Sequence, residues 1–275
     1  MSADTWGAGV FNVAAAHLEV NWVVESSLAT SCYVFLSVFA GALCGMFVRP
    51  VLPDHHLNAE SRDTMKLGLG LIGTMSALIL GLLVSSAKSS YDAQKTEIMQ
   101  LSAKVILLDR IIAHYGPEAA PIRAQLRTLT QHTLYQLWPE HKSRPASLKP
   151  ETNSSEALFD KIHELAPGSE MQTVLKSRAQ NLTIEISETR WLLFEQSSSA
   201  ISAPFLIVLG VWLTIIFSGF GLMAPRNLTV TVTLLLCALS VACAVFLILE
   251  LDRPFDGMIQ ISSEPFQKAL ATLGE

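Results

Sequence analysis

The chain has 275 residues, of which 50% are hydrophobic and only 16% are charged, against about 25% in an ordinary soluble domain. Its formal net charge is -5, and residues 88–200 hold 13 of the 19 Lys and Arg and 13 of the 24 Asp and Glu. This balance excludes a basic nucleic-acid-binding surface, and the composition indicates a membrane protein.

Four uncharged apolar stretches organise the sequence. They cover residues 29–48, 67–87, 201–224 and 228–249. Each has about 20 residues, the length that a helix needs to cross roughly 30 Å of hydrocarbon. Core helices of soluble proteins are rarely so long without a charge. The sequence therefore predicts an all-α integral membrane protein with four transmembrane helices in a 2 + 2 arrangement around a helical extramembrane domain.

The spans divide the chain into five predicted regions. They are an N-terminal tail (1–28), a first transmembrane pair (29–87), a helical extramembrane domain (88–200), a second transmembrane pair (201–249) and a C-terminal segment (250–275). The tail lacks the basic residues of a signal peptide, so we expect it to be retained. It is either loosely ordered or an interfacial helix anchored by Trp6 and Trp22.

The second span is expected to continue beyond the bilayer as a helix. Apolar residues recur there at steps of 3, 4, 3 and 4: Ile98, Leu101, Val105, Leu108 and Ile112. This is the spacing of a seam that packs against a partner helix, which belongs either to another copy or to the same chain. Gly116 and Pro117 are typical of the end of a helix.

Further helices are predicted in the extramembrane domain, and no segment has the alternation of a strand. One covers 121–138, and a loop follows over 139–155. A short helix over 156–165 is expected to be capped by Ser155, and a longer one begins after Ser169 and leads into the third span. Ser263 is expected to cap a last helix that begins at Glu264.

Small residues recur every four positions in three of the spans. The second span has Gly73, Ala77, Gly81 and Ser85; the first has Ser37, Gly41 and Gly45; the third has Gly210, Thr214 and Ser218. Such stripes let helix backbones approach closely, so helix packing is the first interpretation. The alternative is that they line a pore, for which the second span offers these candidates: Thr74, Leu78, Leu82 and Ser85.

Charged residues flank the spans and do not enter them. Arg49 and Lys88 end the first two spans, and Glu250, Asp252 and Arg253 follow the fourth. They are either interfacial anchors or a ring of charges at a pore mouth. Proton relays and many ion-coupled transporters need charged residues within the membrane, so the uncharged spans argue against both classes. The sequence also shows no catalytic constellation, metal site or cofactor motif, which argues against an enzyme.

The segment after the fourth span, LELDRPFDGMIQISSEPF at residues 249–266, resembles the signature of the bestrophin-like domain family. This family comprises mainly bacterial four-span membrane proteins, and its layout is similar to that of this chain. The specific residues are Asp252, Arg253, Pro254, Phe255 and Gly257. The family is distantly similar to bestrophins, which are pentameric anion channels that narrow their pore with aromatic residues on the second span.

Residues 67–87 contain no aromatic residue, so Leu78, Ile79 and Leu82 would have to build any constriction here. The C-terminal signature also allows two interpretations. Pro254 ends a helix and Phe255 can bury against the helical domain as a structural latch. Alternatively, Asp252 and Arg253 lie at an ion entrance.

The leading functional prediction is an oligomeric, ion-channel-like membrane protein that conducts anions, as the resemblance implies. The alternative is a non-conducting scaffold or sensor whose helical domain binds a protein partner. The expected partners are the lipid bilayer, further copies of the chain and ions, without nucleic acid or cofactor. We expect the chain in the bacterial cytoplasmic membrane. The basic short loops favour a helical domain outside the cell, whereas the similarity to bestrophins favours the cytosol.

Overall fold

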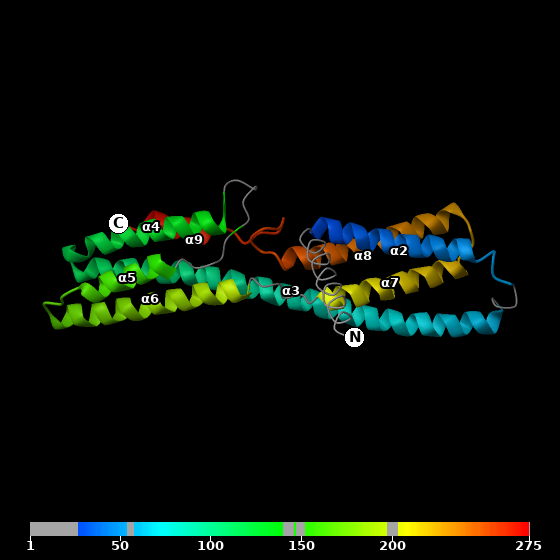
Figure 1. Ribbon diagram of the computed structural model, residues 1–275, viewed down its shortest axis with the longest axis horizontal. Coiled ribbons are helices and arrows are strands. Elements are labelled where there is room, and N and C mark those ends of the chain that lie inside the picture. Colours follow the sequence, from blue (N-terminus) through cyan, green and yellow to red (C-terminus); the bar gives the residue numbers. More distant parts are fainter. Residues whose placement is uncertain (1–26, 54–57, 140–145, 147–151, 197–202, 275) are drawn as a thin grey trace, which may run out of the picture. The chain divides into compact units, whose positions relative to one another are not determined.

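The computed structural model describes residues 27–53, 58–139, 146, 152–196 and 203–274, and these residues form helices without any strand (Figure 1). The predicted all-α class is confirmed. Two compact units emerge, which we call the membrane unit (1–88 and 201–250) and the helical unit (89–200 and 251–275). The expectations for the N-terminal tail and for most of the 139–155 loop fall outside the described residues.

Four helices are long and apolar enough to cross a membrane, and each coincides with one predicted span to within a few residues or contains it. They are α2 (Ser27–Val48), α3 (Ala59–Tyr115), α7 (Ala203–Met223) and α8 (Leu228–Leu251). In the hydrocarbon of a membrane, the backbone groups of a helix form their hydrogen bonds within the helix. Uncharged sequences of this length therefore fold as helices.

Helices α2 and α7 pack closely through the small residues of the first and third spans. A methyl group added at Gly45 would overlap the backbone carbonyl of Ser218, and one added at Gly221 would overlap the carbonyl of Ala42. Gly41 likewise lies against Thr214. Gly41 and Gly45 therefore serve helix packing, as the spacing predicted, because only hydrogen in place of a side chain allows the backbones to approach this closely. Gly221 was not in the predicted stripe, and at Gly210, which was, an added methyl group would meet nothing within 4 Å.

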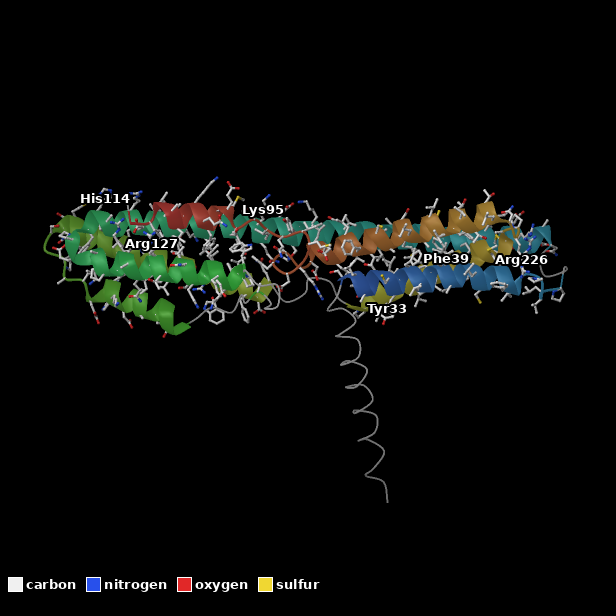
Figure 2. The ribbon with its side chains drawn as sticks, turned by 90° about the horizontal axis from the view of Figure 1, so that it is seen from above. Tyr33, Phe39, Lys95, His114, Arg127 and Arg226 are labelled. Atoms are coloured by element: carbon white, nitrogen blue, oxygen red, sulfur yellow. The ribbon has the colours of Figure 1, made fainter. Side chains whose placement is uncertain are left out.

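Two arginines tie the ends of α2 and α7 together. The Arg226 guanidinium donates from Nε and Nη2 to the Met46 carbonyl at 3.0 and 2.9 Å and lies 5.5 Å from the ring centre of Phe47 (Figure 2). Arg49 donates in turn to the carbonyl of Ala224. The last carbonyls of a helix carry partial negative charge and lack helical partners, so a cation at this position stabilises the end.

We expect Gly221→Ala to destabilise the membrane unit by about 1–3 kcal/mol, because its new methyl group overlaps the Ala42 backbone. Gly210→Ala is the matched control on the same helix, since a methyl group there meets nothing within 4 Å. Thermal unfolding of the purified full-length protein in detergent measures both. Equal midpoints for the two variants would show that α2 and α7 do not pack in this way.

The helical unit contains the outer half of α3 and five further elements. These are η2 (Pro117–Ala119), α4 (Ala120–Leu137), α5 (Thr152–Glu164), α6 (Glu170–Gln196) and α9 (Glu264–Thr272). The prediction that the second span continues as a helix to Gly116 is confirmed. Gly116 has a φ of 136°, a conformation that favours glycine, and it breaks the helix before Pro117.

The predicted seam on α3 forms the core of the helical unit. All five of its residues are buried, and they pack in two clusters. Val105, Leu108 and Ile112 meet residues of α4, α5 and α6, while Ile98 and Leu101 meet Leu137. The idea that this seam holds copies together is therefore wrong, because the chain covers the seam with its own helices. Of the two alternatives, the partner in the same chain is the correct one.

Two of the predicted caps need correction. Helix α5 begins at Thr152, so Ser155 lies inside its first turn; residues 152–155 are all of the capping type, and their composition does not single out one of them. Ser263 precedes α9 but its side chain does not cap it. Its backbone is helical (φ -77°, ψ -6°), whereas a capping serine needs the extended region. The Ser262 hydroxyl accepts the Glu264 N–H at 3.2 Å instead.

The predicted cap at Ser169 is confirmed, since its hydroxyl accepts the Gln172 N–H at 3.2 Å. A second polar feature of the helical unit has no counterpart in the sequence-based prediction. Asp109 of α3 is 1% exposed and accepts two hydrogen bonds of 2.8 Å from Arg123 of α4. These bonds raise the pKa of the Arg123 guanidinium, so it stays charged.

Replacing Arg123 with Met should lower the free energy of unfolding by about 3–5 kcal/mol, because the Asp109 carboxylate would remain buried without its cation. The double variant Arg123→Met, Asp109→Leu should recover most of this loss, since both charges are then absent. Lys161→Met changes an exposed cation and is the control. Chemical denaturation followed by circular dichroism tests the set. An Arg123→Met variant as stable as the control would contradict the role of the pair.

Candidate functional site

The membrane half of α3 presents one face that no other part of the described chain covers. Leu78 and Leu82 are 73% and 64% exposed, and Thr74 and Ser85 are exposed as well. Their spacing of 4, 4 and 3 residues places all four on the same side of the helix. We call this set the hydroxyl–leucine face. It contains the four residues that the sequence offered as pore-lining, whereas Ile79, which was also offered for a constriction, is half-buried.

The chemistry of this face is mixed. The Thr74 hydroxyl donates its proton to the Leu71 carbonyl at 2.8 Å within α3. Its oxygen retains a lone pair that can accept a hydrogen bond from water or contact a cation. Leu78 and Leu82 offer only apolar surface. A face of this kind can surround water at the hydroxyl levels and exclude it at the leucine levels.

A flank of small residues adjoins the hydroxyl–leucine face. A methyl group added at Gly73 or Gly81 would meet nothing within 4 Å, and Ala77 between them is exposed. Among the described residues, the predicted packing groove of α3 is thus unused, in contrast to the glycines of α2. The flank is therefore a candidate surface for packing against another copy.

The C-terminal signature forms a tight turn at the end of α8. The Gly257 N–H donates to the Arg253 carbonyl at 3.0 Å, and the Ile261 N–H donates to the Pro254 carbonyl at 2.8 Å. Pro254 and Phe255 are buried, and Asp252 and Arg253 are half-buried. These four residues belong to the helical unit.

The turn is held by an aromatic clamp centred on Trp138. Its indole N–H donates to the Ile261 carbonyl at 2.8 Å. Its ring lies 6.0 Å from that of Phe255 and 5.9 Å from that of Phe266, centre to centre. Sequence reasoning treated Trp138 only as the last residue of a helix. The missed signal was a large aromatic residue beside Pro139 together with two phenylalanines in the tail.

Glu250 is the remaining charged residue of the predicted mouth or latch. It lies in the last turn of α8 and is 4% exposed. A buried carboxylate is costly unless its environment compensates for the lost hydration. The turn and the burial together favour a structural role for the 250–255 segment, since an ion entrance requires charges that solvent reaches.

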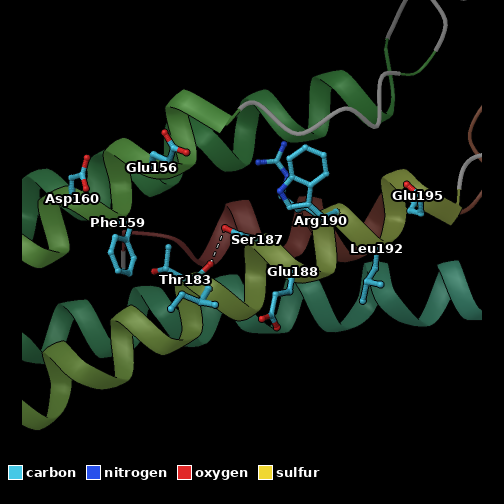
Figure 3. Close-up of a pocket in the computed structure, with 11 residues that line it drawn as sticks. Glu156, Phe159, Asp160, Thr183, Ser187, Glu188, Arg190, Leu192 and Glu195 are labelled. Carbon is cyan, nitrogen blue, oxygen red and sulfur yellow. Dashed lines mark hydrogen bonds between the residues drawn. The ribbon is translucent and has the colours of Figure 1, made fainter.

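A groove of about 790 Å³ runs between α5 and α6 in the helical unit (Figure 3). Its apolar part is formed by Phe159, Ile184, Trp191 and Leu192. Its polar lining comprises Glu156, Asp160, Glu188, Glu195, Arg190, Thr183 and Ser187. Sequence reasoning did not find this groove. The only trace of it in the sequence is an exposed apolar stripe on a helix whose opposite face is already used by the core.

Comparison with known proteins identifies the fold. A family model described as Bestrophin-like domain matches residues 34–266. No curated protein matches the sequence. Similar solved structures are three point variants of a bacterial bestrophin homologue from Klebsiella pneumoniae. They have TM-scores of 0.63–0.65 at 12–14% sequence identity, and the match covers 88–90% of this chain and 97% of theirs.

We expect Gly81→Leu to weaken assembly and leave the fold of the single chain intact, because a methyl group at Gly81 meets none of the described residues within 4 Å. Leu82→Ile, one position along, should be mild in both respects. Light scattering on detergent-solubilised protein measures the mass, and circular dichroism measures the fold. A Gly81→Leu protein that keeps the wild-type mass and thermal stability would show that the flank of α3 is not an interface.

Proposed function

The chain belongs to the bestrophin-like domain family, and from this premise we propose that it assembles into a homo-oligomeric ion channel whose path is lined by the hydroxyl–leucine face of α3. The proposal concerns the axis between copies. Several copies around an axis can bring hydroxyls and flanking charges around a shared path, which a single uncharged bundle cannot do.

The observation that carries the proposal is the contrast between α3 and α7. The exposed face of α7 consists largely of side chains that suit lipid: Phe205, Ile207, Val211 and Ile215. Helix α8 exposes Leu228, Val232, Leu236 and Leu239 together with the hydroxyls of Thr229, Thr233 and Ser240. The exposed face of α3 instead carries Thr74, Ala77, Gly81, Ser85 and Ser86 beside its leucines. Contact with lipid stabilises such a face little. Its small residues suit helix packing, and its hydroxyls suit contact with water.

Within this arrangement, Leu78 and Leu82 form the narrowest apolar part of the path. Two rings of leucine separated by one helical turn create a barrier that acts by excluding water, and ions cross when the ring widens or becomes wet. The resemblance to bestrophins supports anions as the ions conducted. The segment from Glu250 to Phe255 then serves as a latch that fixes the end of α8, because its turn and burial leave little of it for a pore mouth.

The second candidate function is a non-conducting scaffold or sensor in the bacterial cytoplasmic membrane. The groove between α5 and α6 favours it, because an open apolar groove edged with carboxylates is a surface that binds a partner. Both functions place the same four helices in the bilayer. They differ in whether the purified protein passes current.

Purified protein in planar bilayers should conduct, and Leu82→Ser should change the single-channel amplitude at least about twofold, because a hydroxyl wets the apolar constriction. Ile215→Ser is the matched control, since Ile215 is 45% exposed on α7 and is expected to face lipid. Silent bilayers with correctly assembled protein would favour the scaffold. If Leu82→Ser and Ile215→Ser had equal effects on the current, α3 would not line the path.

A further inference from the structure

We infer that the groove between α5 and α6 receives a second copy of this chain, through the part of α3 that carries Lys95, Met99 and Arg110. The inference rests on the proposed homo-oligomer but does not depend on conduction. It names the surface through which the helical units of neighbouring copies meet.

The groove has the composition of a protein interface. Ile184, Trp191 and Leu192 of α6 are 46%, 48% and 55% exposed, which is high for side chains of this size. Four carboxylates line the groove, against a single guanidinium, that of Arg190. A partner that fits must therefore offer apolar side chains together with cations.

The outward side of α3 offers this combination. Met99 and Leu107 are 45% and 44% exposed, and Lys95 and Arg110 are exposed on either side of them (Figure 2 shows Lys95). The two apolar residues are eight positions apart, about 12 Å along the helix. Ile184 and Leu192 in the groove have the same separation, so the two apolar pairs match in length.

The contact continues the small-residue flank of α3. Lys95 follows Ala77, and Met99 follows Gly81, by eighteen residues, which is about five turns of an α-helix. Each pair therefore lies on the same side of α3.

The heights of the charged groups agree with a ring of copies. Gln196 donates to Glu97 at 2.8 Å and Lys104 donates to Thr189 at 3.1 Å, so α6 runs antiparallel to α3 with these residues level. Glu195 is consequently level with residue 98 of α3, only three positions, or about 4.5 Å, from the level of Lys95. Rotation about an axis parallel to α3 of the helical unit preserves height, so the Lys95 of one copy can reach the Glu195 of the next.

The height of Arg110, the second cation, also matches that of a carboxylate in the groove. Gln180 lies 3.1 Å from His163 of α5, which places Asp160 level with Thr183 of α6. By the register between α6 and α3, this is the level of Arg110. Both cations of the α3 surface thus meet a carboxylate at their own height. The contact joins two different surfaces, and such a contact closes into a ring when the rotation permits.

Crosslinking tests the contact without reference to current. In a background in which the four native cysteines are alanine, Met99→Cys and Leu192→Cys chains with different tags are co-expressed, so that a disulfide between the tags must join two molecules. We expect a covalent dimer after mild oxidation. The control pairs Met99→Cys with Met171→Cys, because Met171 lies far along α6 from the level of Met99.

Charge exchange tests the ion pair. Lys95→Glu and Glu195→Lys should each weaken association about fivefold or more, and the double variant should restore it, because the attraction is then re-formed with reversed signs. Glu164→Lys reverses an exposed carboxylate outside the groove and should have no effect. Native mass spectrometry in detergent measures the assembled fraction.

The outcomes separate this inference from the proposed function. Crosslinking with rescue supports the interface even if the bilayers are silent. An assembled, conducting protein that fails to crosslink and shows no rescue would overturn the interface and leave the channel standing. A monomer in native-like lipid, or a groove occupied by a different protein, would overturn the inference as well.

Discussion

The hydrocarbon core of the membrane offers no hydrogen-bond partners, and most of this fold follows from that constraint. Backbone groups must bond within helices, which produces the four long apolar helices. Hydroxyls do the same, as Thr214 does with the Gly210 carbonyl at 2.8 Å. With polar bonds used locally, helices associate through shape, and the glycines of α2 and α7 supply that shape. Polar contacts between helices return where the hydrocarbon ends, at Arg49 and Arg226.

The helical unit follows different rules. Its core is an apolar seam on α3 covered by helices from the same chain, and the deeply buried carboxylate of Asp109 is held by a bidentate arginine. One continuous helix therefore serves both units. Its buried side is mainly apolar, with Ser76, Gln94, Ser102 and Asp109 as polar exceptions, whereas its exposed side changes from leucine and serine to lysine and arginine.

The sequence was sufficient for the features that depend on periodicity. The seam from Ile98 to Ile112, the break at Gly116 and the four spans were all predictable, because helical spacing and length translate directly into structure. The failure of Ser263 to cap α9 could not be predicted, since capping depends on a backbone dihedral. The Trp138 clamp and the groove between α5 and α6 could not be predicted either, because they join residues that are distant in the sequence. Exposure of the hydroxyl–leucine face required the structure as well. Gly41 and Gly81 look alike in the sequence, yet among the described residues Gly41 lies against α7 and Gly81 has nothing close to it.

The uninterrupted course of α3 has a mechanical consequence. No proline occurs between Ala59 and Tyr115, so torque or axial force applied to the part near Tyr115 is transmitted along a single rod. The stiffness of this rod is uneven, since all four of its glycines, at positions 68, 70, 73 and 81, lie in the membrane half. Deformation should concentrate there, next to Leu78 and Leu82. Bending of α3 is then expected in its membrane half, whereas the half near Tyr115 is expected to stay straight.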